Sequence, residues 1–175
     1  MVAIGLAGDE TYQLQPFAAV LDAARDAGVQ LVHHAGEGGG PDSIREAIHV
    51  GHAERLGHGI RVLDDPALVD ALREQALPLE VCPSSNAALG IVPAFSAHPL
   101  PRLRGAGLAV TMNTDIPVVI GTSTAAEYTR VRDAFGYDDT VLADLARAAT
   151  HASFAPPATK KNLRAQIDAW LTAAG

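Results

Sequence analysis

Residues 29–40, VQLVHHAGEGGG, contain the pattern that decides the fold class. The apolar run Val29–His33 is short and is followed by glycines, which predicts a buried strand rather than a helix. The glycines in Gly36–Gly40 predict a flexible loop, and Asp42 is expected to cap a helix that continues through Val50. A strand that leads through a loop into a helix is the repeating unit of sheets with parallel strands.

The same unit recurs along the chain. Further strands are predicted at Val2–Leu6, Arg55–Gly57, Leu77–Cys82 and Leu108–Met112. Helices are predicted at Pro16–Asp26, from Asp65 or Pro66 to about Gln75, and at Thr124–Phe135, Asp138–Ala152 and Pro157–Leu171. This alternation predicts an α/β fold with a parallel sheet and right-handed crossovers. Residues 1–175 show no linker, so we expect a single domain.

Composition and charge exclude several classes of protein. Of the 175 residues, 48% are hydrophobic and 19% are charged, so the chain can bury a core and is not a disordered protein. Its single cysteine excludes a disulfide framework and a cysteine-rich zinc finger. With 20 acidic and 13 basic residues the net charge is −7, which disfavours nucleic acid as a partner. No apolar run reaches the ~20 residues that cross a bilayer and no signal peptide is apparent, so we expect no membrane partner and a cytoplasmic location.

Polar residues follow the end of every predicted strand. These groups are GDE at residues 8–10, HHAGE at 33–37, HG at 58–59, CPSSN at 82–86 and NTD at 113–115. Parallel α/β proteins form their active sites where the carboxyl ends of the strands meet. Five polar strand ends therefore predict one shared site, and they favour an enzyme over a binding module.

Five short motifs around these strand ends, in this order, closely resemble the adenosine deaminase family of zinc-dependent purine deaminases. They are LAGDE at residues 6–10, HAGE at 34–37, RLGHG at 55–59, EVCPSSN at 80–86 and NTD at 113–115. Each motif alone has low specificity, but five in order are specific, and the resemblance covers residues 2–171. It implies a metal-dependent hydrolase fold, namely the C-terminal part (about five β/α units) of a TIM-like (β/α)8 barrel.

The resemblance also implies a role for five residues. His34 corresponds to a zinc ligand, and Asp115 to a zinc-ligating carboxylate that also contacts the attacking water. Glu37 corresponds to the acid that exchanges a proton with N1 of the purine, His58 to the residue that orients the water, and Gly8 to the glycine whose backbone meets the purine ring. Zinc suits this chemistry because it lowers the pKa of bound water from 15.7 to about 7 and so makes hydroxide available at neutral pH.

Three features depart from the family's pattern. The family begins with a strand that carries His-x-His, two further zinc ligands, and this sequence contains no His-x-His. A complete barrel needs ~250 residues, so we expect that this chain lacks the N-terminal strands, that zinc occupancy is reduced, and that exposed sheet edges favour pairing into a homo-oligomer. Ile116 stands where the family usually has a second acid near N7 of the purine, and Gly5 stands where many members have an acid.

The function that this resemblance implies is hydrolytic deamination of a 6-aminopurine, in its simplest form adenosine to inosine and ammonia, with zinc as the cofactor. Few basic residues lie near the motifs, which favours a neutral nucleoside or base over a nucleotide as the small-molecule substrate. Because of Ile116, another aminopurine is an alternative substrate. A non-catalytic remnant or assembly module of the same fold, and a related hydrolase of a different amine or amide, are further alternatives.

Other polar residues near the motifs are expected to have structural roles. His33 precedes His34 on a strand, where neighbouring side chains point to opposite faces, so it is expected to pack behind the site. Cys82 is expected to lie in the core. Ser84 and Ser85 have no basic partner arranged in the sequence, which disfavours a serine hydrolase.

Overall fold

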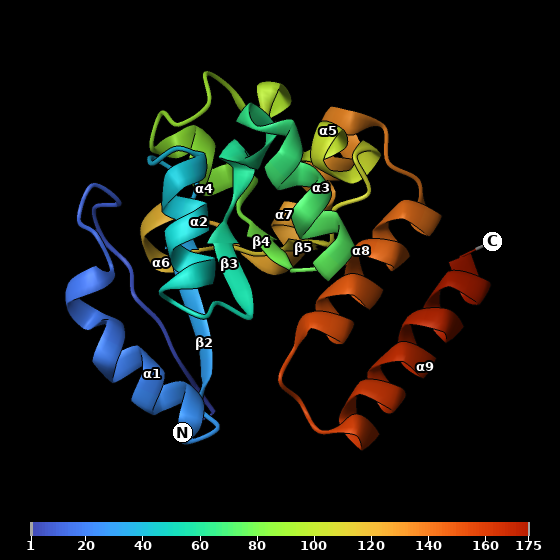
Figure 1. The fold of residues 1–175 in the computed structure, drawn as a ribbon. Helices are drawn as coiled ribbons and strands as arrows, with labels where there is room; N and C mark the ends of the chain where they lie inside the picture. Colours follow the sequence, from blue (N-terminus) through green and yellow to red (C-terminus); the bar gives the residue numbers. More distant parts are fainter. Residues whose placement is uncertain (1, 175) are drawn as a thin grey trace. The chain divides into compact units, whose positions relative to one another are not determined.

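The computed structural model describes residues 2–174 and divides into two compact units (Figure 1). The first unit contains residues 2–81 and 102–109, and the second contains residues 82–101 and 110–174. Short strands alternate with helices along the chain, as predicted for an α/β fold.

The first unit is built on a parallel sheet. Its strands are β1 (Ala3–Ile4), β2 (Gln30–Ala35), β3 (Arg55–His58) and β4 (Leu79–Val81). They are hydrogen-bonded in sequence order, β1 to β2, β2 to β3 and β3 to β4, and every pair is parallel. The sequence predicts all four strands, but their ends differ from the predicted ones.

β1 is shorter than predicted because the regular hydrogen bonding to β2 is interrupted at Gly5, although the carbonyl of Leu6 still accepts from the N–H of His34 at 2.9 Å. A Cβ atom on Gly5 would lie 1.9 Å from the carbonyl oxygen of Val32, so only glycine fits against β2 at this point. The N–H of Leu6 donates to ring atom Nδ1 of His33 at 3.1 Å. A side chain thus takes the place of the next ladder bond, and the strand predicted at Val2–Leu6 is only two residues long.

Helical segments alternate with the strands of the first unit, and Pro16, Pro41 and Pro66 lie at the starts of three of them. These segments are a 3-10 turn at Gln15–Phe17, α1 (Ala18–Asp26), α2 (Pro41–His49), a 3-10 turn at Ile60–Asp64 and α3 (Pro66–Gln75). The carboxylate of Asp65 accepts hydrogen bonds from the N–H groups of Ala67 and Leu68, so α3 begins where predicted. Asp42 does not cap α2 as predicted. It lies inside the first turn, and Gly40 is the N-cap without a side-chain hydrogen bond.

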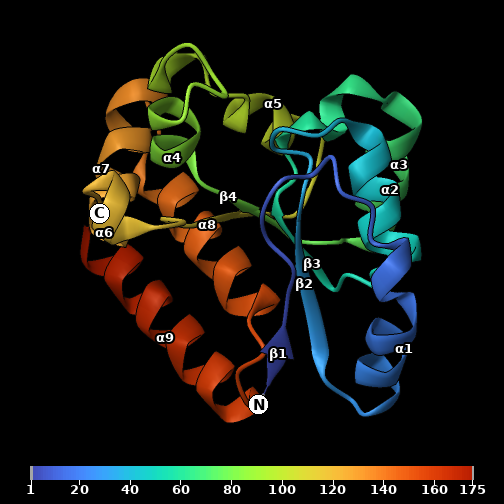
Figure 2. The ribbon, with the colours of Figure 1, turned by 90° about the vertical axis from the view of Figure 1, so that its left-hand side faces the viewer.

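The core of the first unit lies between the sheet and its helices. Leu31, Leu56 and Leu79 come from three neighbouring strands and are fully buried. Helices α1 and α2 contact β2, and Figure 2 shows both beside that strand. Burying each leucine contributes roughly 1.5–3 kcal/mol, which favours this packing and fixes the strand ends relative to one another.

The second unit is mostly helical. It contains α4 (Pro83–Ala88), a 3-10 turn at Phe95–Ala97, β5 (Val110–Met112), α6 (Pro117–Ile120), α7 (Thr124–Phe135), α8 (Asp139–Ala152) and α9 (Pro157–Ala174), and α5 (Leu100–Gly105) begins in it. Helix α8 packs against both β5 and α9, and Figure 2 shows α8 and α9 side by side. Among the helices of residues 2–174, none combines the length and apolar character needed to cross a bilayer.

No pattern in the sequence predicts α4, α5 or α6. These helices have six, six and four residues, too few to show the 3.6-residue periodicity of a helix. α4 and α6 begin at Pro83 and Pro117, a few residues after β4 and β5 end, because proline has no N–H to lose at the first helical position. For the same reason the strand predicted at Leu77–Cys82 stops at Val81.

Candidate active site

The carboxyl ends of β2 and β3 bring three of the predicted site residues together in the first unit. His34 lies at the end of β2, Glu37 follows in the next loop, and His58 is the last residue of β3. The register places His34 beside Gly57 and Ala35 beside His58. The three side chains therefore start from the same end of the sheet, the one formed by the carboxyl ends of its strands.

The imidazole rings of His34 and His58 lie close together. Their centroids are 5.1 Å apart, and the ring planes are tilted by 55°. Gly57 makes room for this approach, since a Cβ there would lie 3.2 Å from Nδ1 of His34. His58 is 1% exposed and has a φ of 64°, a left-handed conformation that costs a non-glycine residue free energy. Such strain at a buried residue persists where the surrounding structure holds it, and it is common at functional sites.

Glu37 and His58 form a carboxylate–imidazole contact. Atom Oε1 of Glu37 lies 3.3 Å from Nδ1 of His58, and the Glu37 side chain is 18% exposed. A carboxylate and an imidazole are the groups that proteins use most often to donate and accept protons. The pair can therefore hold a proton at this edge of the sheet and release it to a bound molecule.

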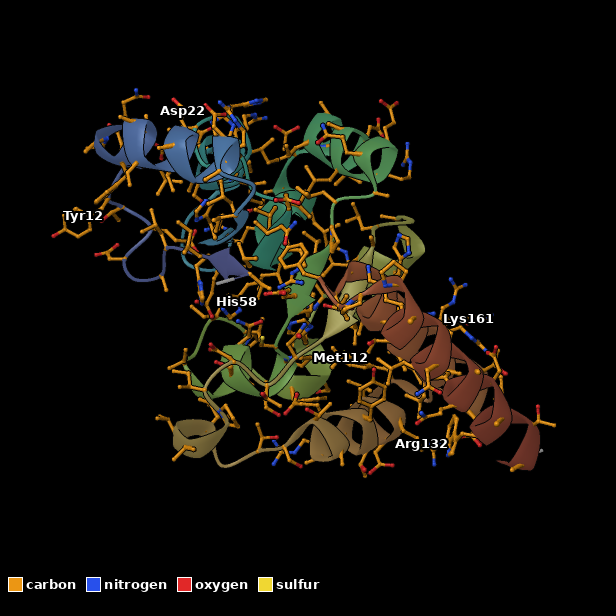
Figure 3. The ribbon with its side chains drawn as sticks, turned by 90° about the horizontal axis from the view of Figure 1, so that it is seen from below. Tyr12, Asp22, His58, Met112, Arg132 and Lys161 are labelled. Atoms are coloured by element: carbon orange, nitrogen blue, oxygen red, sulfur yellow. The ribbon has the colours of Figure 1, made fainter. Side chains whose placement is uncertain are left out.

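A cavity of about 210 Å³ lies beside His34 in the first unit. Its walls include Gly8, Tyr12, Leu14 and Phe17 from the segment between β1 and α1. Gly8 has a φ of 129°, which a residue with a side chain rarely adopts, and no atom lies within 4 Å of where its Cβ would be. The backbone of Gly8 is therefore open to a ligand. Tyr12 points away from the ribbon of its loop in Figure 3 and is 77% exposed.

Glu10 is a site residue that sequence reasoning missed. Its carboxylate accepts hydrogen bonds from the N–H groups of Gly36, Glu37 and Gly39, and from the hydroxyl of Ser43. The glycine-rich loop after β2 is thus tied to the segment after β1. In the sequence Glu10 shows only as a polar residue after a predicted strand, and no local pattern indicates a partner 26 residues away.

His33 packs behind the site, as predicted. It is fully buried, and its two ring nitrogens are used by the backbone: Nδ1 accepts from the N–H of Leu6, and Nε2 lies 2.8 Å from the carbonyl oxygen of Gly51. The hydrogen bonds assign the proton of the neutral ring to Nε2. Burial is the main reason that the pKa of His33 is lower than its ordinary value of 6.5. A neutral ring with both nitrogens engaged is unsuited to bind a metal.

In the second unit, Asp115 follows β5 and is held by a serine. The hydroxyl of Ser85 donates to Oδ2 of Asp115 at 2.6 Å. Ser85 is fully buried, and Asp115 has a φ of 59°, another left-handed conformation outside glycine. Sequence reasoning treated Ser85 only as an unsuitable nucleophile. The structure gives it a different task, because it fixes the orientation of the Asp115 carboxylate.

A buried carboxylate supports the start of α4, the helix that carries Ser85. Glu127 on α7 is fully buried, and it accepts hydrogen bonds from the N–H of Ser84 and the hydroxyl of Thr122. The guanidinium of Arg130 donates to the hydroxyl of Ser84 at 2.6 Å. These contacts link α7 to the start of α4. Glu127 sits in a helix without a recognisable motif, so the sequence does not single it out.

His34 and Asp115 have the donor atoms that a zinc site requires. The imidazole of His34 lines the cavity of the first unit, and each residue offers one ligand atom. Ser85 engages one carboxylate oxygen of Asp115, and a carboxylate has lone pairs for further partners. Imidazole nitrogen and carboxylate oxygen are usual ligands of catalytic zinc. Each of these two side chains therefore supplies one donor of a kind that zinc binds, and a complete catalytic site has three protein ligands.

Gly5 and Ile116, two of the departures from the family pattern, have different structural settings. Gly5 lies against the backbone of β2, so an acid there would require the strands to move apart. Ile116 is the N-cap of α6 and is 47% exposed, followed by Val118 and Val119, which are also exposed. An apolar side chain thus stands directly after Asp115.

Comparison with known proteins identifies the family. The sequence profile described as adenosine deaminase matches residues 1–170. An adenine deaminase of Rhizobium leguminosarum bv. trifolii is 41% identical over 168 residues, which are 95% of this chain and 52% of that protein. An adenine deaminase of Agrobacterium fabrum is 39% identical over the same shares of both chains. The chain spans about half the length of the curated relatives that it matches.

A solved structure shows the same fold over nearly the whole chain. The crystal structure of an adenine deaminase from Arthrobacter aurescens superposes with a TM-score of 0.95 at 33% identity, covering 98% of this chain and 53% of that one. Half-length coverage agrees with the predicted correspondence to one part of a barrel. The chain belongs to the adenosine deaminase family, and its fold is that of the C-terminal part of the family's (β/α)8 barrel.

Proposed function

We propose that this chain supplies part of the active site of a zinc-dependent purine deaminase, which replaces the 6-amino group of a purine by oxygen. One observation carries the proposal: in a member of this family, Glu37 and His58 form a carboxylate–imidazole contact at the end of the sheet where His34 also lies. The cavity beside His34, with the open backbone of Gly8 in its wall, supports a bound planar ring there.

We assign zinc binding to His34 and Asp115. With zinc bound, hydroxide is available at neutral pH, because the metal lowers the pKa of water to about 7. Ser85 keeps the Asp115 carboxylate in one orientation, which preserves the geometry that a metal site needs.

Glu37 and His58 carry the proton transfers in this proposal. As an oxygen of water adds to C6, Glu37 donates a proton to N1 of the purine ring, and His58 orients the attacking water. One proton of that water then leaves with the amino group as ammonia when the C6–N bond breaks, and the other passes from the C6 hydroxyl to Glu37, which replaces the proton that Glu37 gave to N1. Glu37 must act first as an acid and then as a base, and its contact with His58 lets the pair redistribute the proton.

The substrate is the finer part of the proposal. The motifs predict a 6-aminopurine, with adenosine as its simplest form, whereas the relatives from Rhizobium leguminosarum and Arthrobacter aurescens are named adenine deaminases. A structure of ADAL from Arabidopsis, 26% identical with a TM-score of 0.86, holds IMP, a 6-oxopurine nucleotide. We therefore propose a purine ring as the recognised group and adenine as the first substrate to test, with adenosine second.

A non-catalytic remnant of the same fold is the second candidate. It is favoured by Ile116 in place of the usual second acid and by the absence of His-x-His from residues 1–175. A remnant would keep the fold and the buried contacts, and it would lose zinc affinity and turnover.

Turnover in matched variants separates these candidates. The purified chain, supplemented with zinc, is assayed with adenine, adenosine and related aminopurines, together with Glu37→Gln and the exposed control Glu54→Gln. We expect Glu37→Gln to lower kcat at least a hundredfold, because general acid–base catalysis contributes about 10²–10⁴-fold, and Glu54→Gln to have no effect.

If the kcat of Glu37→Gln lies within tenfold of the wild-type value, Glu37 does not transfer the proton. If the chain has no turnover, the same panel is applied to the product extended upstream of Met1 in the gene. No turnover there favours the remnant.

A further inference from the structure

We propose that Glu10 is the positioning residue for Glu37, a role that rests on the proposed deaminase function. Its carboxylate holds the backbone of residues 36–39 in the one conformation that directs the Glu37 side chain to His58. Glu10 itself does not touch His58 or the reacting ring. It acts through the loop that carries the acid.

The hydrogen bonds of Glu10 converge on that loop. Oε1 accepts from the N–H of Glu37 at 2.9 Å, and Oε2 accepts from the N–H of Gly36 at 2.8 Å and of Gly39 at 2.9 Å. The hydroxyl of Ser43, on α2, lies 2.8 Å from Oε2 and anchors the far end of the loop. Backbone N–H groups that converge on a carboxylate form a strong, charge-assisted site. The two oxygens thus fix both the residue before Glu37 and the residue two positions after it.

The glycines of the loop provide an independent observation. A Cβ on Gly39 would lie 2.4 Å from Oε2 of Glu10, so the position of the carboxylate requires a glycine there. Gly36 has a φ of 69°, and a Cβ on it would lie 2.5 Å from Ile44. The glycines at positions 36 and 39 therefore let the loop pack closely around the carboxylate of Glu10, and they are more than a flexible connection.

The adjacent acid shows that this role is specific to Glu10. Asp9 accepts a hydrogen bond from the N–H of Thr11, two residues away, and stays in its own turn. Glu10, with one more methylene, reaches the loop after β2. Because Glu10 also follows Gly8 by two residues, one carboxylate couples the segment that lines the cavity to the loop that carries the acid.

Positioning matters here because the role of Glu37 depends on a short contact. Glu37 lies 3.3 Å from His58, and a displacement of 1 Å at a reacting group can cost on the order of a hundredfold in rate. Without Glu10, the N–H groups of Glu37 and Gly39 would turn to water, and that of Gly36 would keep only the hydroxyl of Ser43, so the glycine-rich loop would sample several conformations.

Amide hydrogen exchange followed by NMR tests the loop contacts directly on the chain as it exists. The variant is Glu10→Gln, which keeps the shape of the side chain but loses its charge and one acceptor oxygen, and the control is the exposed Glu54→Gln. A hydrogen bond to a charged acceptor is stronger than one to a neutral acceptor, so the amides of Glu37 and Gly39 should exchange at least tenfold faster in Glu10→Gln, and that of Gly36 less so because it also donates to Ser43. Unchanged exchange at Glu37 overturns the proposal.

The ring resonances of His58 report whether the loop places Glu37. We expect the Cε1–H signal of His58 to move in Glu10→Gln in the same direction as in Glu37→Gln, and to stay in place in Glu54→Gln. If Glu10→Gln does not fold, Gly39→Ala is the second variant, because its methyl group displaces the carboxylate without changing any charge. A His58 signal that moves in Glu37→Gln but not in the folded variant overturns the proposal.

Kinetics then separate positioning from the proposed function. In the form of the protein that shows turnover, Glu10→Gln should lower kcat at least tenfold with KM unchanged within twofold, and should have no further effect in the Glu37→Gln background. Additive effects of the two substitutions overturn the positioning role. If no form shows turnover, the proposed function fails, while exchange and the His58 signal still decide whether Glu10 places Glu37.

Discussion

His34 and its neighbour His33 show how two adjacent histidines acquire different chemistry. His34 presents its ring to the cavity, whereas both ring nitrogens of His33 are bound to the backbone. We expect His34→Ala to weaken zinc binding on the order of tenfold or more, because a ligand is lost, and His49→Ala, at the exposed end of α2, to leave it unchanged. The measurement is the zinc content per chain at a buffered free zinc concentration. Equal contents in the two variants would exclude His34 as a ligand.

The buried ring of His33 predicts a pH effect. Its pKa in the folded chain is below 6.5, chiefly because burial disfavours the charged ring. The unfolded chain therefore takes up this proton first as the pH falls, so the contribution of His33 to stability is complete above about pH 6.5 and is lost as the pH falls through the folded pKa. An NMR titration of its Cε1–H signal should give a midpoint below 6.5. A midpoint at or above that value contradicts this burial.

Residues of the candidate site differ in how far the sequence reveals them. His34, Glu37, His58 and Asp115 lie at or near strand ends within short motifs, which are local features. Glu10 contacts residues 26 to 33 positions away, so its partners appear only when β1 and β2 are paired. The roles assigned to the motif residues remain predictions for the variants above to test.

Among the secondary-structure elements, β3 contributes residues to both the candidate site and the hydrophobic core. Leu56 is fully buried on β3, two residues before His58. We expect Leu56→Ala to lower the free energy of unfolding by about 2–5 kcal/mol, because it leaves a cavity between the sheet and its helices. Val118→Ala, on a side chain that is 94% exposed, should change it by less than about 0.5 kcal/mol. Urea unfolding of both variants checks this, and equal midpoints would contradict the packing.

The elements that were predicted incorrectly share one cause. The existence of β2, β3, α3, α7 and α8 follows from periodicity and caps, which are local. The early end of β1 depends on the close approach of Gly5 to Val32, and α4 and α6 depend on prolines that follow strand ends. In each case a contact or a single residue overrides the hydrophobic pattern of the neighbouring residues in the sequence.

For the whole molecule, the family and the coarse architecture follow from the order of the motifs along the chain. Five motifs at successive strand ends predict a deaminase barrel, and the family match over residues 1–170 confirms the family. The half-length coverage of the relatives agrees with the predicted correspondence to the C-terminal part. A single domain, and pairing of exposed sheet edges into a homo-oligomer, remain predictions.

The sequence by itself determined the fold class, the family and the identity of the candidate catalytic groups, because strand periodicity, glycine punctuation and short motifs are encoded within a few residues of one another. Only the tertiary structure decided which groups hold these residues in place: Glu10 for the Glu37 loop, Ser85 for Asp115 and Glu127 for the start of α4. The physical reason is that a hydrogen bond depends on distance and direction between atoms. Residues tens of positions apart reach those distances only after the strands have paired and the core has packed.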